Sequence, residues 1–165
     1  MRITGTSRAV CGFLATLVLA ATAIGQNTAT NSKCQPIGGF ISTNVGGFGP
    51  NTTMGTVVGD PAGAVGVEIL DLTTGANGLV DISVHHHWVT TNGDTLTIDK
   101  ANAYGVYVAP GLLAVTDYKV HLAGGTGRYQ NTDGDINVIG EADFNAGILV
   151  LRFTGQLCRE KDGQD

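Results

Sequence analysis

Three consecutive histidines are the residues of this chain whose types and spacing are best suited to chemistry. His85, His86 and His87 lie within the run from Leu79 to Thr90, where apolar and polar residues alternate. A period of two predicts a β-strand, whose successive side chains point to opposite faces. His85 and His87 are therefore expected on one face and His86 on the other. Because imidazole binds metal ions and transfers protons near neutral pH, each face is a candidate site.

The histidine strand is followed by Asn-Gly at 92–93 and a second alternating run over 94–101, a pattern that predicts a β-hairpin. With a two-residue loop, both faces of the hairpin would mix apolar and polar residues. With a three-residue loop, one face carries Val80, Ile82, Val84, His86, Trp88, Leu96 and Ile98. A one-residue slip exchanges the two faces, so we expect the second register, which separates apolar from polar residues more cleanly. It places Asp99 directly across from His85.

The polar face of this hairpin holds the expected metal ligands, His85, His87 and Asp99. A carboxylate beside an imidazole fixes its tautomer and raises its basicity, which suits a metal ligand or a general base. A closed zinc site needs four protein ligands, and the two histidines supply only two of them. Three interpretations stay open: a solvent-facing strand surface, an oligomer contact, and a metal or proton-transfer site. No cofactor is expected other than a metal ion in the third.

The apolar face is expected to line the interior of the fold. His86, Trp88, Tyr118, His121 and Arg152 are the candidates for binding a ligand there. Trp88 and Tyr118 suit a flat apolar molecule because each combines an apolar ring with a polar tip. Two positions of Arg152 stay open: exposed or ion-paired on the outside, or inside if the apolar face of its strand packs on another subunit. The pattern assigns no catalytic residue.

A glycine-rich turn follows the alternating run over 112–122. It consists of Gly124, Gly125, Thr126, Gly127, Arg128 and Tyr129. Glycine adopts positive φ without steric cost, so three glycines in four positions predict a tight structural turn. A phosphate-binding loop would need Gly-Lys-Ser/Thr and a following helix, which excludes that function here. We expect Arg128 to anchor the turn by pairing with Asp133 or Asp135.

Short alternating runs separated by Gly, Asn and Asp make up the rest of the chain after the first 33 residues. They predict strands over 38–45, 53–59, 64–72, 79–90, 94–101, 112–122, 133–140 and 148–158, with a further short strand over 104–108. No helical periodicity accompanies them. The pattern is typical of an all-β sandwich or barrel, here one domain over 34–158.

The two ends of the chain differ from this domain in composition. Residues 1–25 have the form of a signal peptide, with Arg2 and Arg8 before an apolar core and small residues after it. The apolar core is shorter than a bilayer span, so we expect an exported protein, periplasmic or extracellular, without a membrane span. Residues 26–33 are expected to form a flexible leader, and 159–165 a charged tail.

Removal of the signal peptide leaves two cysteines, Cys34 and Cys158. In an exported protein such a pair is expected to form a disulfide, with buried free thiols as the alternative. The net charge of −5 for the whole chain becomes −7 without Arg2 and Arg8, and the acidic residues are scattered. This distribution favours solubility and argues against a nucleic-acid partner.

The glycine turn resembles the Gly-Gly-Thr-Gly turn of barrel proteins of the allene oxide cyclase and dirigent type. The matching residues are Gly124, Gly125, Thr126, Gly127 and Tyr129, followed by Gly134, within a similarity that runs from His85 to Cys158. Asn131 stands where such turns usually carry another glycine. A branch of exported bacterial proteins is more similar still. It shares the phrases His-His-Trp-Val-Thr at 86–90 and Gly-Asp-Thr-Leu at 93–96, and the closing Cys158.

The resemblance implies a closed eight-stranded antiparallel β-barrel with an apolar lumen, a fold that is often homo-oligomeric in plant members. The polar and acidic lumen residues that serve catalysis in the plant enzymes have no counterpart here. Three functions stay open. The first is binding of a small apolar molecule in the lumen, with or without cyclase, isomerase or dirigent-like control of its chemistry. The others are a noncatalytic extracellular module stabilised by the disulfide, and metal binding through the histidine hairpin.

Overall fold

The computed structural model of the protein describes residues 33–159. The expected signal peptide, 1–25, lies outside these residues. So do all of the expected leader except Lys33 and all of the expected tail except Arg159. Lys33 is the first residue of strand β1 and Arg159 the last residue of strand β9, so the sheet extends slightly further at both ends than the sequence predicts.

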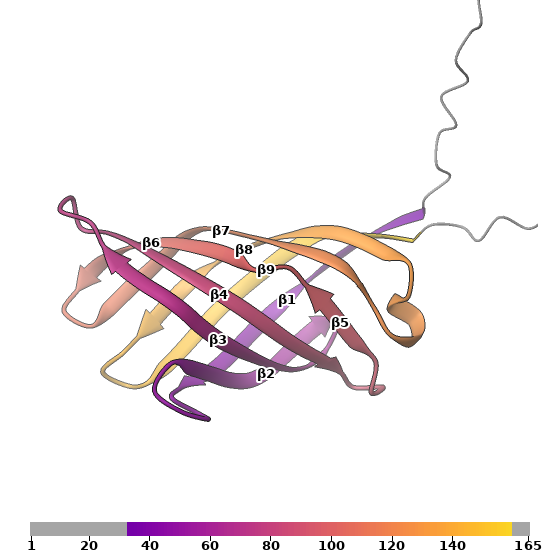
Figure 1. The fold of residues 1–165 in the computed structure, drawn as a ribbon, viewed down its shortest axis with the longest axis horizontal. Helices are drawn as coiled ribbons and strands as arrows, with labels where there is room; N and C mark the ends of the chain where they lie inside the picture. The colour runs from indigo at the N-terminus through magenta and orange to yellow at the C-terminus, as the bar shows by residue number, and fades with distance from the viewer. Residues whose placement is uncertain (1–32, 160–165) are drawn as a thin grey trace, which may run out of the picture.

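The described residues form nine β-strands and one short 3₁₀-helix, η1 (Figure 1). Their bounds are β1 Lys33–Val45, β2 Thr52–Asp60, β3 Gly63–Thr74, β4 Leu79–Thr90, β5 Thr95–Ile98, β6 Ala101–Ala109, β7 Leu112–Gly125, η1 Gly127–Tyr129, β8 Thr132–Asp143 and β9 Ile148–Arg159. Among residues 33–159, no helix is long and apolar enough to cross a membrane.

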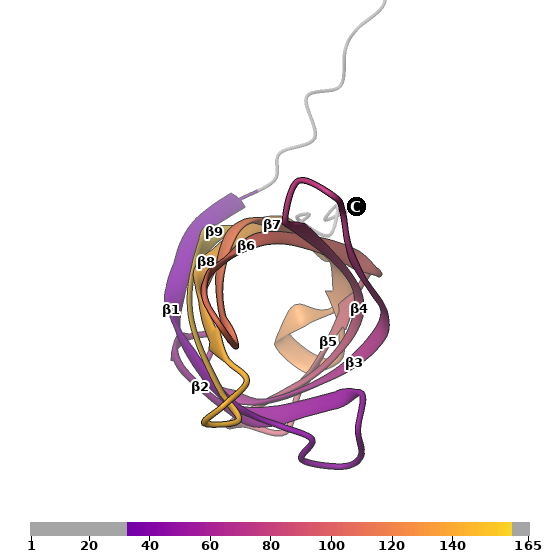
Figure 2. The same ribbon diagram turned by 90° about the vertical axis from the view of Figure 1, so that its left-hand side faces the viewer.

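The strands close into an antiparallel barrel of eight positions, which confirms the predicted fold. Strands that follow one another in the sequence pair, except β5 with β6, and β1 pairs with β9 to close the ring (Figure 2). Strands β5 and β6 both lie between β4 and β7, so together they occupy one position. The break between them falls at Asp99 and Lys100, inside the run predicted as one strand over 94–101.

The inward face of the barrel carries the hydrophobic core. Trp88 pairs with Leu96 across the β4–β5 hairpin, which confirms the predicted register and its separation of apolar from polar residues. Phe153 on β9 is fully buried and meets the Trp88 ring edge-on, with ring centroids 5.5 Å apart. Alternation along each strand therefore fills the interior mainly with apolar side chains, while the outer face mixes polar residues with exposed apolar ones such as Phe40, Val58 and Val150.

The glycine turn closes one end of the barrel. It carries η1, which lies at the far end of the ring in Figure 2, and Tyr129 of η1 is 4% exposed. Gly124 and Gly127 have φ of 120° and 54°, and Asn131 has φ of 57°, so the turn needs residues that tolerate positive φ. Arg128 pairs with Asp60 at 3.4 Å, not with Asp133 or Asp135 as predicted, because the turn folds back toward the end of β2.

The expected disulfide between Cys34 and Cys158 is confirmed. The two cysteines face each other directly in the pairing of β1 with β9, the two strands that close the ring. Residues 33–37 of β1 pair with β9 alone, since β2 begins to pair with β1 at Gly38. The bridge therefore links the two ends of the domain at the point where the barrel closes.

Candidate functional site

A cavity of about 80 Å³ lies in the lumen of the barrel. Its wall is apolar except for Thr43, Thr53, His86, Trp88 and Tyr118. No acidic residue, lysine or arginine lines it among the residues that the structure describes. An engineered apolar cavity of about 150 Å³ binds benzene, so a lumen cavity of about half that volume takes a molecule smaller than benzene. The lumen therefore suits a compact uncharged molecule rather than an ion.

The cavity reaches the end of the barrel opposite η1. Leu72, at the end of β3, lines the cavity and is still 42% exposed. Phe144 and Leu149, which flank the β8–β9 turn, also line the cavity and are partly buried. At the other end the lumen is filled by buried side chains, among them Leu122 and Tyr129, that do not line the cavity. Access from solvent is therefore at the end formed by the β3–β4 and β8–β9 turns.

His86 and Tyr118 form the polar centre of the lumen wall. They lie on β4 and β7, on either side of the broken β5–β6 position, and the Tyr118 hydroxyl is hydrogen-bonded to His86 Nε2. Their rings are stacked, with centroids 5.7 Å apart. Both are buried, with 9% and 7% of their surface exposed. The sequence predicted these two residues and Trp88 as lumen residues, and the structure brings all three onto the cavity wall.

Burial also decides the protonation of this pair. It lowers the pKa of His86 from 6.5 to about 4, with the nearby charges of His85 and His87 acting in the same direction. Burial likewise raises the pKa of Tyr118 above its ordinary value. His86 is therefore a neutral imidazole and Tyr118 a neutral phenol at neutral pH. The pair is a set of uncharged hydrogen-bonding groups in an apolar space.

Several buried polar atoms of the lumen have no protein partner. Thr43 Oγ1, His86 Nδ1 and Trp88 Nε1 are three of the four buried side-chain atoms without a hydrogen bond among the described residues. All three residues line the cavity. An unpartnered buried polar group costs about 1–3 kcal/mol, so such atoms are usually satisfied by water or a ligand.

Two of the predicted lumen residues lie elsewhere: the assignment of His121 to the lumen was wrong, and Arg152 has the first of its two expected positions, on the outside. Arg152 is exposed on the outer face because its neighbours in β9, Leu151 and Phe153, point inward. His121 is on the outer face of β7 between the buried Val120 and Leu122. Neither lines the cavity. Each of these two residues stands between two apolar residues that point inward. Strand alternation therefore places His121 and Arg152 on the outer face.

His121 instead forms a cluster with three carboxylates on the outer face. Its Nδ1 is 3.0 Å from Asp135 Oδ1, and its Nε2 is 3.4 Å from Asp133 and 4.0 Å from Asp99. The hydrogen bond to Asp135 and the charges of the three carboxylates raise the pKa of His121 above its ordinary value, against a smaller opposing effect of burial. All four side chains are at least 41% exposed, so solvent screens the cluster.

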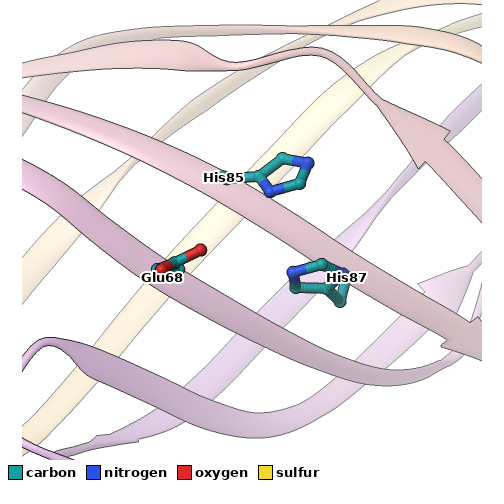
Figure 3. A group of neighbouring side chains, drawn as sticks. All are labelled: Glu68, His85 and His87. Atoms are coloured by element: carbon teal, nitrogen blue, oxygen red, sulfur yellow. The ribbon is translucent and has the colours of Figure 1, made fainter.

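The predicted ligand set of His85, His87 and Asp99 is only partly brought together. The carboxylate opposite His85 is Glu68, on β3. Asp99 was wrongly placed there: strand β5 ends at Ile98, and the register with β4 shifts by one residue before β6 begins. The Asp99 N–H donates to the His121 carbonyl at 3.1 Å, and its side chain faces the His121 cluster. Figure 3 shows Glu68, His85 and His87 together on the outer wall.

No protein-family model matches the sequence. No curated protein matches it either. Among solved structures, the chain is similar to a pterocarpan synthase dirigent protein, with a TM-score of 0.35 and 16% sequence identity over 88% of this chain and 98% of that one.

Proposed function

We propose that this protein is an exported barrel that binds a small, mostly apolar molecule in its lumen and holds an oxygen atom of that molecule at His86. The observation that carries the proposal is the unpartnered Nδ1 of His86, a buried polar atom on the wall of an otherwise apolar cavity. Ligand sites commonly combine an apolar wall with a few polar groups that set orientation.

The hydrogen bond between His86 and Tyr118 defines what the ligand must offer. If the phenol donates to Nε2, the neutral imidazole carries its proton on Nδ1, and one donor faces no partner. In the reverse arrangement both the phenol hydrogen and Nδ1 would lack a partner. The first arrangement leaves fewer buried groups unsatisfied. The matching ligand group is therefore an acceptor, such as a carbonyl or ether oxygen.

Trp88 Nε1 supports the same ligand chemistry. This second unpartnered donor lies on the same face of β4 as His86, two residues further along the strand. Two donors on one strand of an apolar wall suit a ring or chain that carries one or two oxygen acceptors. Among residues 33–159 no acidic residue, lysine or arginine lines the wall, which argues against carboxylate or phosphate ligands. The disulfide is consistent with export to an oxidising compartment.

A matched pair of probes tests this proposal. Acetone and isobutene have similar shapes and fewer atoms than benzene, but only the ketone carries an acceptor. Trp88 is the sole tryptophan of the chain, so its fluorescence reports on the lumen, and methyl NMR shifts of Leu113 and Val138 report on the same wall. We expect saturable binding of the ketone, in the millimolar range for so small a ligand, and weaker binding of the hydrocarbon.

Two variants make the test specific. His86→Leu keeps the side-chain bulk but removes both ring nitrogens, so it should remove the preference for the ketone while leaving the cavity in place. Arg152→Gln, on the outer face, should leave both affinities unchanged. A lumen that takes up neither probe, with Trp88 emission and methyl shifts constant to the solubility limit, would refute the proposal.

A further inference from the structure

We infer that Glu68, His85 and His87 form a binding site for a divalent transition-metal ion, Zn²⁺ in the first instance, on the outer wall of the barrel. One potential ligand atom from each residue lies within 4.8 Å of those from the other two. Figure 3 shows the two imidazoles on one side of β4 and the carboxylate beside them on β3. This site is separate from the lumen, since the three side chains are on the outer face.

Strand pairing holds the three residues in place. His85 and His87 are two residues apart on β4 and therefore share a face, with ring centroids 4.7 Å apart. Glu68 is directly opposite His85 in the pairing of β3 with β4. Sites on paired strands are positioned more accurately than sites on loops. The three side chains thus lie together because of the register between β3 and β4. A shift of that pairing by one residue would separate them.

The three side chains are also available to an ion. The ion pairs found among residues 33–159 involve His121 or Arg128, and Glu68 takes part in none of them. Glu68 and His87 are exposed and His85 is half-buried, so an ion can enter from solvent without a change of fold. Two imidazoles and a carboxylate form a ligand set that suits Zn²⁺ and neighbouring first-row ions.

The geometry requires only side-chain rotation. Zinc binds imidazole nitrogen and carboxylate oxygen at about 2.0–2.2 Å, which places two ligands of a tetrahedral site about 3.3 Å apart. The ligand atoms, within 4.8 Å of one another, must therefore approach by up to about 1.5 Å. Three protein ligands leave the fourth position to water, so the site is of the open type.

Gly66 provides an independent way to test the location. It lies directly opposite His87 on β3, on the same face as Glu68. A Cβ atom at this glycine would have no other atom within 4 Å, so the wall has room for a fourth side chain. Gly66→His would add a ligand beside His87 and turn an open site into a closed one.

The test uses the mature protein without a histidine tag, stripped of metal by EDTA, with Zn²⁺ or Co²⁺ alone as the probe. Isothermal titration should give one Zn²⁺ per chain, and Co²⁺ should give the visible absorption of a site with nitrogen ligands. His85→Asn, His87→Asn and Glu68→Gln should each weaken Zn²⁺ binding roughly tenfold or more. Gly66→His should strengthen it.

His121→Asn is the matched control, because it removes another exposed histidine that lies beside carboxylates. It should leave Zn²⁺ affinity unchanged. Absence of Zn²⁺ binding by the wild-type protein would overturn the inference. So would wild-type affinity in the His85 and His87 variants, or loss of binding in His121→Asn, which would place the ion at the other cluster. Circular dichroism of each variant establishes that the barrel is intact.

Discussion

Removal of the Cys34–Cys158 disulfide should destabilise the barrel strongly. The bridge joins residues 124 positions apart, so it closes nearly the whole domain into one loop. The chain-entropy model gives a stabilisation of about 5 kcal/mol for a loop of this length, through restriction of the unfolded state. Domains of this size are typically stable by about 5–15 kcal/mol, so the bridge contributes a third or more of the total.

Urea denaturation of the wild-type protein and of the double variant Cys34→Ser/Cys158→Ser measures this contribution. With a urea slope of about 2 kcal/mol per M, the midpoint should fall by about 2 M. The wild-type protein in dithiothreitol should behave like the variant, because Cys34 is exposed and the bridge can be reduced without unfolding. Thiol titration of the denatured chain, with and without reductant, controls for the state of the bridge.

An unchanged midpoint in both experiments would refute this reasoning. In that case the bridge would act only on residues 33–37, the segment of β1 that pairs with β9 alone. Hydrogen exchange distinguishes the two outcomes. Reduction should accelerate exchange of the most protected amides throughout the barrel if the effect is global, and only those of 33–37 if it is local.

Three further predictions concern the rest of the barrel. His121→Asn should lower the free energy of unfolding by up to about 1 kcal/mol near pH 6. The difference from wild type should vanish as the pH rises through the raised pKa of His121, because the three carboxylates stabilise the imidazole only while it is protonated. Chemical denaturation at several pH values measures this difference, and a difference that does not change with pH would contradict the prediction. Gly55→Ala should cost about 2 kcal/mol or more because its Cβ would lie 1.8 Å from the Ser42 carbonyl oxygen. Gly66→Ala, with open space, should be nearly neutral, and equal thermal midpoints for the two variants would contradict the packing described. Phe153→Ala should lower the free energy of unfolding, measured by urea denaturation, by about 3–5 kcal/mol because the Phe153 ring is fully buried. A decrease of less than about 1 kcal/mol would show that Phe153 is not a core residue.

The sequence predicts the barrel well because period-two alternation records which residues face the lumen. The register of the β4–β5 hairpin follows from the same pattern: only one loop length places Trp88 and Leu96 on a single apolar face, and the structure has that pairing. Lumen residues such as His86 and Tyr118 were accessible to this reasoning because apolar residues two positions away define the face: Val84 and Trp88 for His86, and Val120 for Tyr118.

The two carboxylates near the histidine strand that the sequence misplaces or misses depend on irregular pairing. Asp99 follows the end of β5, where a register shift turns it toward His121, and no alternation pattern encodes such a shift. Glu68 was missed because its place opposite His85 depends on the β3–β4 register, which contains a further irregularity between Ile69 and Asp71.

The measurement that tests the central claim most directly is a high-resolution crystal structure of the mature protein soaked with acetone. We predict density for one ketone in the lumen, with its oxygen within hydrogen-bond distance of His86 Nδ1 and its methyl groups against the apolar wall. The variant Ala103→Leu, which adds bulk to the cavity wall, should show no such density after the same soak. A wild-type lumen completely packed by its own side chains, or a ketone found only outside it, would contradict the proposal that the barrel binds its ligand there.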